Sequence, residues 1–199
     1  MTRTLAPAVA PTAGAGGPGH PPAGLTWGVK RSLLQYIAGL PDGGHTTSGG
    51  AYVCETSFFT FPPERGADNT QECAELRFRG SLQLGGHAGM LQIIITDPRV
   101  VRSESGMVLT IADRTGGPGE SERLAIADLE INDAYRTRHG LVLPLMTATL
   151  TSAGCEIFGG HYPPGEQLDP LFAFAPRVGG AAADWGADNL LEQSRMYSV

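Results

Sequence analysis

The chain has 199 residues, enough for one domain with a hydrophobic core and additional tails. Its 20 acidic and 14 basic residues give a net charge of -6, and Lys30 is the only lysine. With no basic block, we expect no nucleic-acid partner. The 28 glycines and 15 prolines are typical of a turn-rich β protein or of a protein with flexible ends.

Residues 1–24 are rich in Ala, Pro and Gly and predict a disordered tail, because they cannot bury enough apolar surface to offset the entropy of ordering. Pro7, Pro11 and Pro18 interrupt its apolar stretch, whereas a secretory signal needs an unbroken one. Residues 14–19 match a GxGxxG pattern, but no strand precedes them and no helix follows. We therefore reject dinucleotide binding.

Residues 27–40 predict the first helix, which Thr26 would cap and residues 41–44 would end. Its apolar residues recur at helical spacing on one face, and they are Val29, Leu33, Tyr36, Ile37 and Leu40. This spacing predicts that Tyr36 lies on or beside the buried face, near the C-terminal end of the helix.

A series of short apolar or alternating segments follows the helix and predicts β-strands. These segments are 52–61, 76–84, 90–95, 100–101, 107–111, 124–131 and 141–143. Residues 84–90 form a glycine-rich turn between two of the strands, which predicts a hairpin with His87 at its tip. Residues 113–122 form a Gly/Pro-rich loop.

Residues 151–158 predict a second short helix, which Gly159 and Gly160 end. Residues 171–174 predict a last strand, and residues 176–199 a C-terminal tail in which Leu190 and Leu191 could add a short helix. The pattern favours a mainly β fold, an antiparallel β-sandwich or barrel-like domain over residues 25–175 with two short α-helices.

No apolar run is long enough to span a bilayer, and residues 195–199 carry no lipidation signal. The three cysteines, Cys54, Cys73 and Cys155, have no CxxC spacing, which indicates reduced thiols rather than a disulfide framework or a zinc site. We therefore expect a cytoplasmic protein without a membrane partner.

Several strings along the chain resemble, in order, those of the Htaa-domain family. They are Leu25-Thr26-Trp27-Gly28-Val29-Lys30, Tyr36-Ile37, Phe78-Arg79-Gly80-Ser81, Gly86-His87-Ala88-Gly89, Thr96-Asp97-Pro98-Arg99-Val100, Leu150-Thr151-Ser152-Ala153-Gly154, Gly159-Gly160-His161-Tyr162-Pro163-Pro164-Gly165 and Leu168-Asp169-Pro170. The resemblance implies a β-rich domain that binds heme, usually in secreted or cell-surface uptake proteins. It implies that Tyr36 ligates the heme iron, that His87 supports Tyr36, and that Tyr162 occupies an aromatic position beside the heme. Without an export signal, we expect cytosolic heme binding rather than uptake.

The chemistry of the two residues agrees with this role. A free phenol has a pKa of about 10, and a ferric ion beside its oxygen favours the anion. A histidine N–H aimed at that oxygen stabilises it further. Four apolar residues of the strands are candidates for the walls of the pocket: Phe78, Leu82, Leu84 and Ile93.

The alternative is a cytosolic biosynthetic enzyme without heme, a lyase or cyclase. In it Tyr36 and His87 would exchange protons during dehydration, Michael-type addition or cyclisation of a large apolar substrate. A heme enzyme and a binding domain for another apolar ligand also remain open. Pattern alone makes Tyr36 a core tyrosine and His87 an exposed loop residue.

The other polar residues predict structural roles. His45, His139 and His161 are isolated and predict solvated loop positions, with no zinc-ligand spacing among them. Asp42, Asp97 and Asp113 are expected to form turns. Glu72 and Glu75 are expected on an exposed edge, without an acid–base role.

Overall fold

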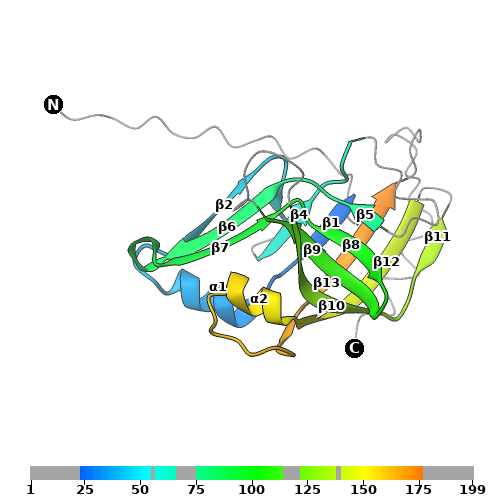
Figure 1. The fold of residues 1–199 in the computed structure, drawn as a ribbon. Helices are drawn as coiled ribbons and strands as arrows, with labels where there is room; N and C mark the ends of the chain where they lie inside the picture. Colours follow the sequence, from blue (N-terminus) through cyan, green and yellow to red (C-terminus); the bar gives the residue numbers. More distant parts are fainter. Residues whose placement is uncertain (1–22, 55–56, 66–74, 114–121, 138–139, 177–199) are drawn as a thin grey trace, which may run out of the picture. The chain divides into compact units, whose positions relative to one another are not determined.

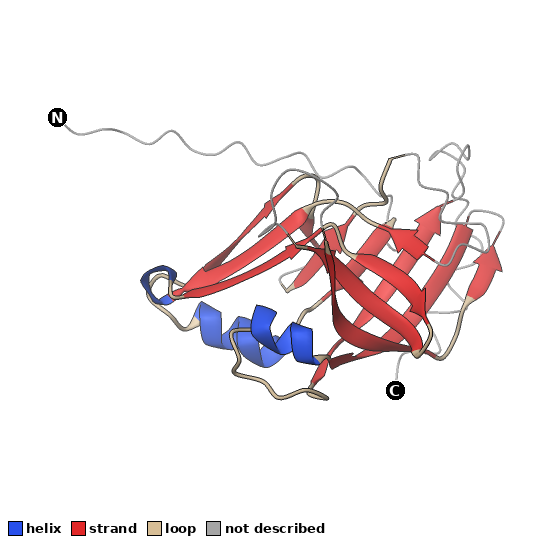
Figure 2. Ribbon diagram, in the orientation of Figure 1, coloured by secondary structure: helices blue, strands red, loops and turns tan. Residues whose placement is uncertain are grey.

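A computed structural model describes residues 23–54, 57–65, 75–113, 122–137 and 140–176, all within one unit, Pro22–Ala181. These residues form two antiparallel sheets and two short α-helices, as expected (Figures 1 and 2). The two tails expected from the sequence, Cys73, Glu72, His139 and most of the 113–122 loop lie outside the described residues.

Ten strands form the large sheet. In spatial order they are β3 (Tyr52–Cys54), β4 (Phe58–Phe61), β1 (Gly24–Trp27), β13 (Gln167–Pro176), β12 (Gly140–Leu150), β10 (Arg123–Ile131), β9 (Gly106–Ala112), β8 (Arg99–Ser103) and β5 (Glu75–Arg77), with β11 (Tyr135–Thr137) paired to β12. All neighbouring strands of this sheet in the described chain are antiparallel. The first and last described strands, β1 and β13, lie side by side and join the two ends of the domain.

The small sheet has the order β2 (Gly44–Ser48), β6 (Ser81–Gly86) and β7 (Leu91–Thr96). Buried and more exposed residues alternate along β6, as the period-two pattern of the sequence predicts. They also alternate along most of β7, whose apolar run predicts a more fully buried strand. The short 3-10 helix η1 (His87–Gly89) joins β6 to β7 and completes the predicted hairpin.

The first helix, α1, spans Arg31–Ala38 and contacts β6 of the small sheet. The expected start at residue 27 is wrong because Trp27 ends β1, where its side chain is fully buried and its Nε1 donates to the carbonyl oxygen of Asp169 at 2.8 Å. Thr26 also lies in β1 and is not a helix cap. Val29 has a φ of 59°, which helical backbone does not allow, so the helix begins only after it.

The second helix, α2, spans Ser152–Ile157 and contacts β10. Thr151 caps it, because its Oγ1 accepts a hydrogen bond from the Gly154 N–H at 3.0 Å. The same hydroxyl donates to the Ala125 carbonyl oxygen at 2.6 Å, which ties the start of α2 to the large sheet.

Several strand boundaries differ from the expectation. The segment 76–84 is divided between β5 of the large sheet and β6 of the small sheet, and Gly80 lies at the division with a φ of 113°. A Cβ there would lie 2.6 Å from the Ala51 backbone nitrogen, so only glycine fits. The segment 52–61 contains two strands, and the sequence pattern missed β1, β2 and β11.

The core lies between the sheets and under both helices. Its largest fully buried side chains include Trp27, Phe61, Phe78 and Phe158. The four residues expected to line a ligand pocket, Phe78, Leu82, Leu84 and Ile93, are all buried in this core. Of these, only Leu84 borders the cavity beside the first helix, so the other three serve packing.

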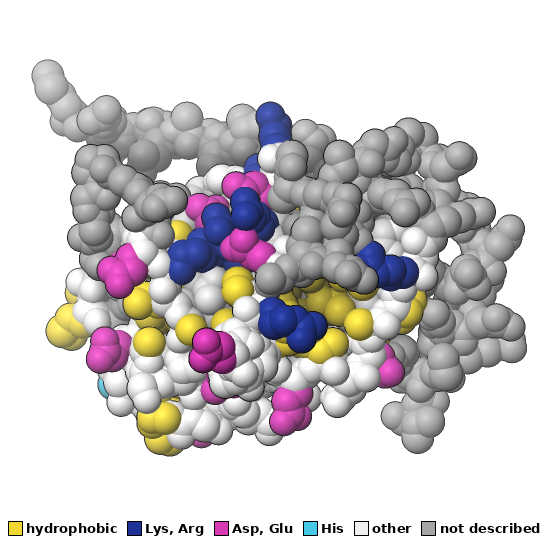
Figure 3. All heavy atoms as spheres, turned by 45° about the vertical axis from the view of Figure 1, so that its right-hand side comes forward, with side chains coloured by type: hydrophobic (Ala, Val, Ile, Leu, Met, Phe, Trp, Pro, Cys, Tyr) yellow, Lys and Arg dark blue, Asp and Glu magenta, His cyan; other side chains and the backbone are white. Residues whose placement is uncertain are grey.

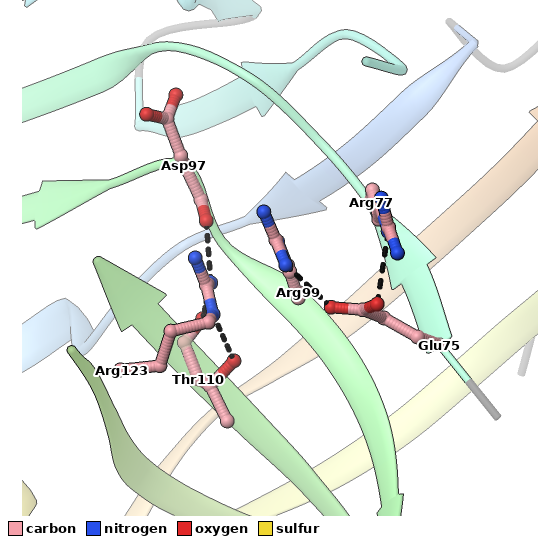
Figure 4. Close-up of polar contacts among 6 residues, drawn as sticks. All are labelled: Glu75, Arg77, Asp97, Arg99, Thr110 and Arg123. Carbon is pink, nitrogen blue, oxygen red and sulfur yellow. Dashed lines mark hydrogen bonds and ion pairs between the residues drawn. The ribbon is translucent and has the colours of Figure 1, made fainter. Parts of the chain in front are cut away.

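Charged residues tie Arg123 of the large sheet to the turn that leaves the small sheet, and tie β5 to β8 within the large sheet (Figure 4). Arg123 of β10 donates to the backbone carbonyl of Asp97, in the turn from β7 to β8, at 2.7 Å, and to the Thr110 hydroxyl at 3.0 Å. Arg77 and Arg99 both pair with Glu75, at 2.9 and 2.8 Å. Figure 3 shows basic and acidic side chains interleaved in one area of the surface.

Burial and the charge of Arg99 lower the pKa of Arg123 to about 10. Desolvation opposes ionisation of Glu75, but its bonds and charges with Arg99 and Arg77 outweigh this and leave its pKa below the usual range. Glu75 therefore has a structural role on the edge strand β5, where its side chain is half-buried rather than exposed as the sequence predicts.

Cys54 and Cys155 are free thiols. Among the described residues, no helix is long and apolar enough to cross a membrane.

Candidate functional site

Tyr36 and His87 meet although 51 residues separate them in the sequence. Tyr36 comes from the last turn of α1, and His87 comes from the tip of the β6–β7 hairpin. The Tyr36 hydroxyl oxygen and His87 Nε2 form a short hydrogen bond, and the two ring centroids lie 5.7 Å apart. The pair proposed from the sequence is therefore a contact in the folded chain.

The Tyr36 side chain is not buried, contrary to the expectation from periodicity. It is 52% exposed, whereas Leu33 and Ile37 point into the core. A helix turns about 100° per residue, so the position next to a buried residue lies at the side of the helix. The phenol can therefore be reached from solvent while it contacts His87.

The backbone of the hairpin tip is strained. His87 and Ala88 have φ values of 54° and 53°, a left-handed region that non-glycine residues adopt uncommonly. Asp42, in the turn that follows α1, holds this conformation. Its carboxylate accepts hydrogen bonds from the His87 N–H at 3.1 Å and from the Ala88 N–H at 2.5 Å.

These bonds favour the charged form of Asp42. The Ala88 N–H makes the largest contribution and, against a smaller desolvation effect, leaves the pKa of Asp42 below its ordinary value. Because Asp42 follows the helix that carries Tyr36, one short segment positions both members of the pair.

The sequence predicted Asp42 only as a turn former. No local signal identifies its second role, since its partners lie 45 and 46 residues further along the chain. The glycines around His87 indicated an unusual backbone, but they did not indicate what stabilises it.

Tyr162 lies away from the pair, near the beginning of α1. Its ring packs edge-on against Phe158, and Lys30 Nζ lies 5.0 Å from the ring centroid. Lys30 also donates to Glu166 at 2.6 Å and to the Gln167 carbonyl oxygen at 3.0 Å. Lys30 therefore fastens the segment around Tyr162 to the N-terminal end of α1.

The remaining histidines differ in their surroundings. His161 is exposed after α2, in agreement with the sequence. His45 is not a loop residue: it lies in β2, and its ring contacts Phe59 edge-on at 5.4 Å between centroids. The part of the chain that the structure describes holds no group of three His, Cys, Asp or Glu side chains suited to a metal ion.

The Tyr36–His87 contact allows two proton arrangements. Either the phenol O–H donates to an unprotonated Nε2, or the Nε2–H donates to the phenol oxygen. If Tyr36 becomes a phenolate, only the second arrangement remains, and His87 then stabilises the anion. The pair can thus share a proton or present an anionic oxygen to a cation.

A cavity of about 480 Å³ lies beside α1, but neither Tyr36 nor His87 lines it. Its walls come from α1, β2, β4 and β6, and Asp169 of β13 borders it. The exposed pair and the cavity are therefore separate features.

Comparisons with known proteins agree with this fold. The model of the Htaa family matches residues 23–173, which confirms the resemblance seen in the sequence. No curated protein sequence matches the chain.

The solved structures that resemble it include three from Corynebacterium glutamicum. The C-terminal domain of HtaA is 25% identical with a TM-score of 0.60, and the match covers 76% of this chain and 94% of that domain. The N-terminal domain of HtaA is also 25% identical, with a TM-score of 0.57 and coverage of 78% and 96%. The heme binding protein HtaB shares the fold, with 18% identity and a TM-score of 0.57. This match covers 75% of this chain and 90% of HtaB. The chain therefore belongs to the Htaa family.

Proposed function

We propose that this protein binds ferric heme, with the Tyr36 oxygen as axial ligand and His87 as hydrogen-bond donor to it. The observation that carries the proposal is the contact between a solvent-accessible phenol and an imidazole at the surface of an Htaa-family fold. HtaB, which shares the fold, is a heme binding protein.

The residues around the pair fit this group. The Tyr36 hydroxyl is open to solvent, so a planar ligand has access to it. Met90, whose N–H donates to the His87 carbonyl oxygen at 3.1 Å, is 85% exposed and offers an apolar contact beside the pair. Ser32 lies one helical turn before Tyr36 on the same side of α1, toward the end of the helix that lies near Tyr162.

Each residue has a defined task in this proposal. Bound ferric iron would supply the positive charge that favours the phenolate of Tyr36 over the phenol. His87 would donate its Nε2–H to that oxygen, and Asp42 would keep His87 in place through the two backbone hydrogen bonds. An anionic oxygen ligand favours ferric over ferrous iron, which suits storage or transfer of heme.

The exposure of Tyr36 favours heme binding over the enzyme considered from the sequence. That enzyme required Tyr36 and His87 in a closed apolar cavity, where burial tunes the proton affinities. The enzyme and the cytosolic location both stay predictions, and the location can be tested by cell fractionation.

A hemin titration of the purified full-length chain tests the proposal. We expect saturable binding at one site with a shifted Soret band, and we expect Tyr36→Phe to lose the tyrosinate–ferric spectrum. Tyr135→Phe, on β11, is the matched control and should behave like the original protein. An unchanged spectrum and affinity in Tyr36→Phe would refute the assignment of the ligand.

A further inference from the structure

The cavity beside α1 has the size of a small-molecule site. Its volume of about 480 Å³ lies within the range of roughly 300–1,000 Å³ typical of ligand pockets. It is partly open to solvent, and its walls mix apolar and polar side chains. In the view of Figure 1, α1 lies below β2, β6 and β7, the strands of the small sheet.

The cavity lies on a different side of α1 from Tyr36. Five residues of α1 line it, Arg31, Leu34, Gln35, Ile37 and Ala38, and Tyr36 does not. Arg31 and Tyr36 are five residues apart, which separates their directions by about 140° at 3.6 residues per turn. A ligand in the cavity therefore does not need the proposed heme site.

His45 points to the inner side of the small sheet. It lies opposite Leu84 of β6, and Leu84 lies opposite Ile93 of β7. Side chains directly opposite each other in antiparallel strands share one face, and Leu84 and Ile93 are each only 1% exposed. His45 thus lies on the same face as these core residues, but it is exposed and borders the cavity next to Phe59.

The polar side chains of the cavity have free hydrogen-bonding capacity. Within the described ranges, Arg31, Gln35 and His45 make no side-chain hydrogen bond or ion pair, and the carboxylate of Asp169 makes none either. These groups offer both hydrogen-bond donors and acceptors beside the apolar walls.

The Asp169 carboxylate is held at the edge of the cavity by its own backbone. The Asp169 N–H donates to the Val29 carbonyl oxygen at 3.0 Å, and its carbonyl accepts from Trp27. Gly28 leaves room for the carboxylate, because a Cβ at that position would lie 2.9 Å from Asp169 Oδ2. The same Cβ would lie 3.4 Å from the Phe58 ring, another wall of the cavity.

We propose that this cavity binds a small aromatic carboxylate that also carries a hydroxyl or amino group. The Arg31 guanidinium pairs with the carboxylate in a two-bond geometry that suits both groups. The ring packs between Phe58, Leu84 and Leu34, and the Asp169 carboxylate accepts from the hydroxyl or amino substituent. His45 and Gln35 supply further donors.

Isothermal titration and NMR on the full-length chain test this site, with L-tryptophan as the aromatic carboxylate probe. Tryptamine, which keeps the ring and the ammonium but lacks the carboxylate, is the matched ligand control. We expect saturable binding of L-tryptophan with shifts at Arg31 and His45, and at least tenfold weaker binding of tryptamine. Absence of saturable binding, or equal binding of the two probes, would overturn the proposal.

Two variants assign the binding to the cavity. Arg31→Gln should weaken the binding of L-tryptophan about tenfold and leave the binding of tryptamine unchanged, because only the carboxylate loses its partner. Ala38→Trp should fill the cavity and weaken the binding of both probes. Arg102→Gln, on β8, is the control and should bind like the original protein. An Arg31→Gln variant that binds L-tryptophan normally would contradict the assignment.

The two proposals can fail separately. Arg31→Gln and Ala38→Trp should bind hemin as the original protein does, since neither residue shares the side of α1 that carries Tyr36. If hemin displaces L-tryptophan, the cavity is part of the heme site and the inference is wrong. If hemin does not bind but L-tryptophan does, the cavity site stands and the proposed function falls.

Discussion

Replacement of His87 by Asn tests whether the imidazole acts through the Tyr36 oxygen. Asn tolerates the left-handed backbone that His87 adopts, with its φ of 54°, so the hairpin tip should keep its shape. The shorter side chain cannot reach the Tyr36 hydroxyl that His87 contacts. The substitution therefore removes the hydrogen bond and spares the backbone.

The size of the effect follows from the exposure of the site. Loss of a hydrogen bond to a metal ligand typically costs 10–100-fold in affinity. Because Tyr36 is 52% exposed, water can replace part of the lost bond, so we expect the lower end of that range. Hemin should then bind His87→Asn about tenfold more weakly, which corresponds to about 1.4 kcal/mol.

The assay is a hemin titration followed at the Soret band, repeated with metal-free protoporphyrin IX. Replacement of His87 should not change the affinity for the metal-free ring, since that ring forms no bond to the Tyr36 oxygen. His87→Gln keeps an N–H donor on a longer side chain and should recover part of the affinity. Equal hemin affinity in His87→Asn, or an equal loss for the metal-free ring, would refute the reasoning.

Three further predictions concern the support of the site and the fold. Asp42→Ala should speed amide hydrogen exchange at the tip of the β6–β7 hairpin. In the original protein, the same amides should lose protection only as the pH falls through the lowered pKa of Asp42, below its ordinary 3.8. Thr151→Ala should lower the free energy of unfolding by roughly 1–2 kcal/mol in urea denaturation, and Thr151→Ser should not. Glu75 has a lowered pKa, so its ion pairs stabilise the fold above pH 4.5 and are lost as the pH falls through the folded value. Thermal melts of Glu75→Gln should lack that part of the acid sensitivity, and an identical pH profile would contradict the role of Glu75.

The strained hairpin tip indicates why the site depends on residues outside the pair. Left-handed backbone at two consecutive non-glycine residues has a conformational cost, and such strain persists only where the surroundings hold it. Here Asp42 supplies two hydrogen bonds to that backbone. The orientation of His87 toward Tyr36 is thus a property of the turn after α1 as well as of the hairpin.

Local patterns were sufficient for most elements of the fold. Period-two alternation identified β6, an apolar run identified β7, glycines identified the turn that carries His87, and Thr151 with Gly159 marked the limits of α2. These signals are local because side-chain alternation, caps and turns depend on residues a few positions apart. The ordered strings shared with the Htaa family also identified the family and the Tyr36–His87 pair from sequence.

Only the tertiary structure decided how distant elements pair and what lies opposite each of them. Helical periodicity could not show that Trp27 belongs to a strand, because that choice depends on pairing of β1 with β13, more than 140 residues away in the sequence. Nor could local patterns predict that Tyr36 is exposed, that Asp42 holds the His87 turn, or that His45 lies beside a cavity. Each of these results arises from contacts between residues distant in the chain, which no local pattern records.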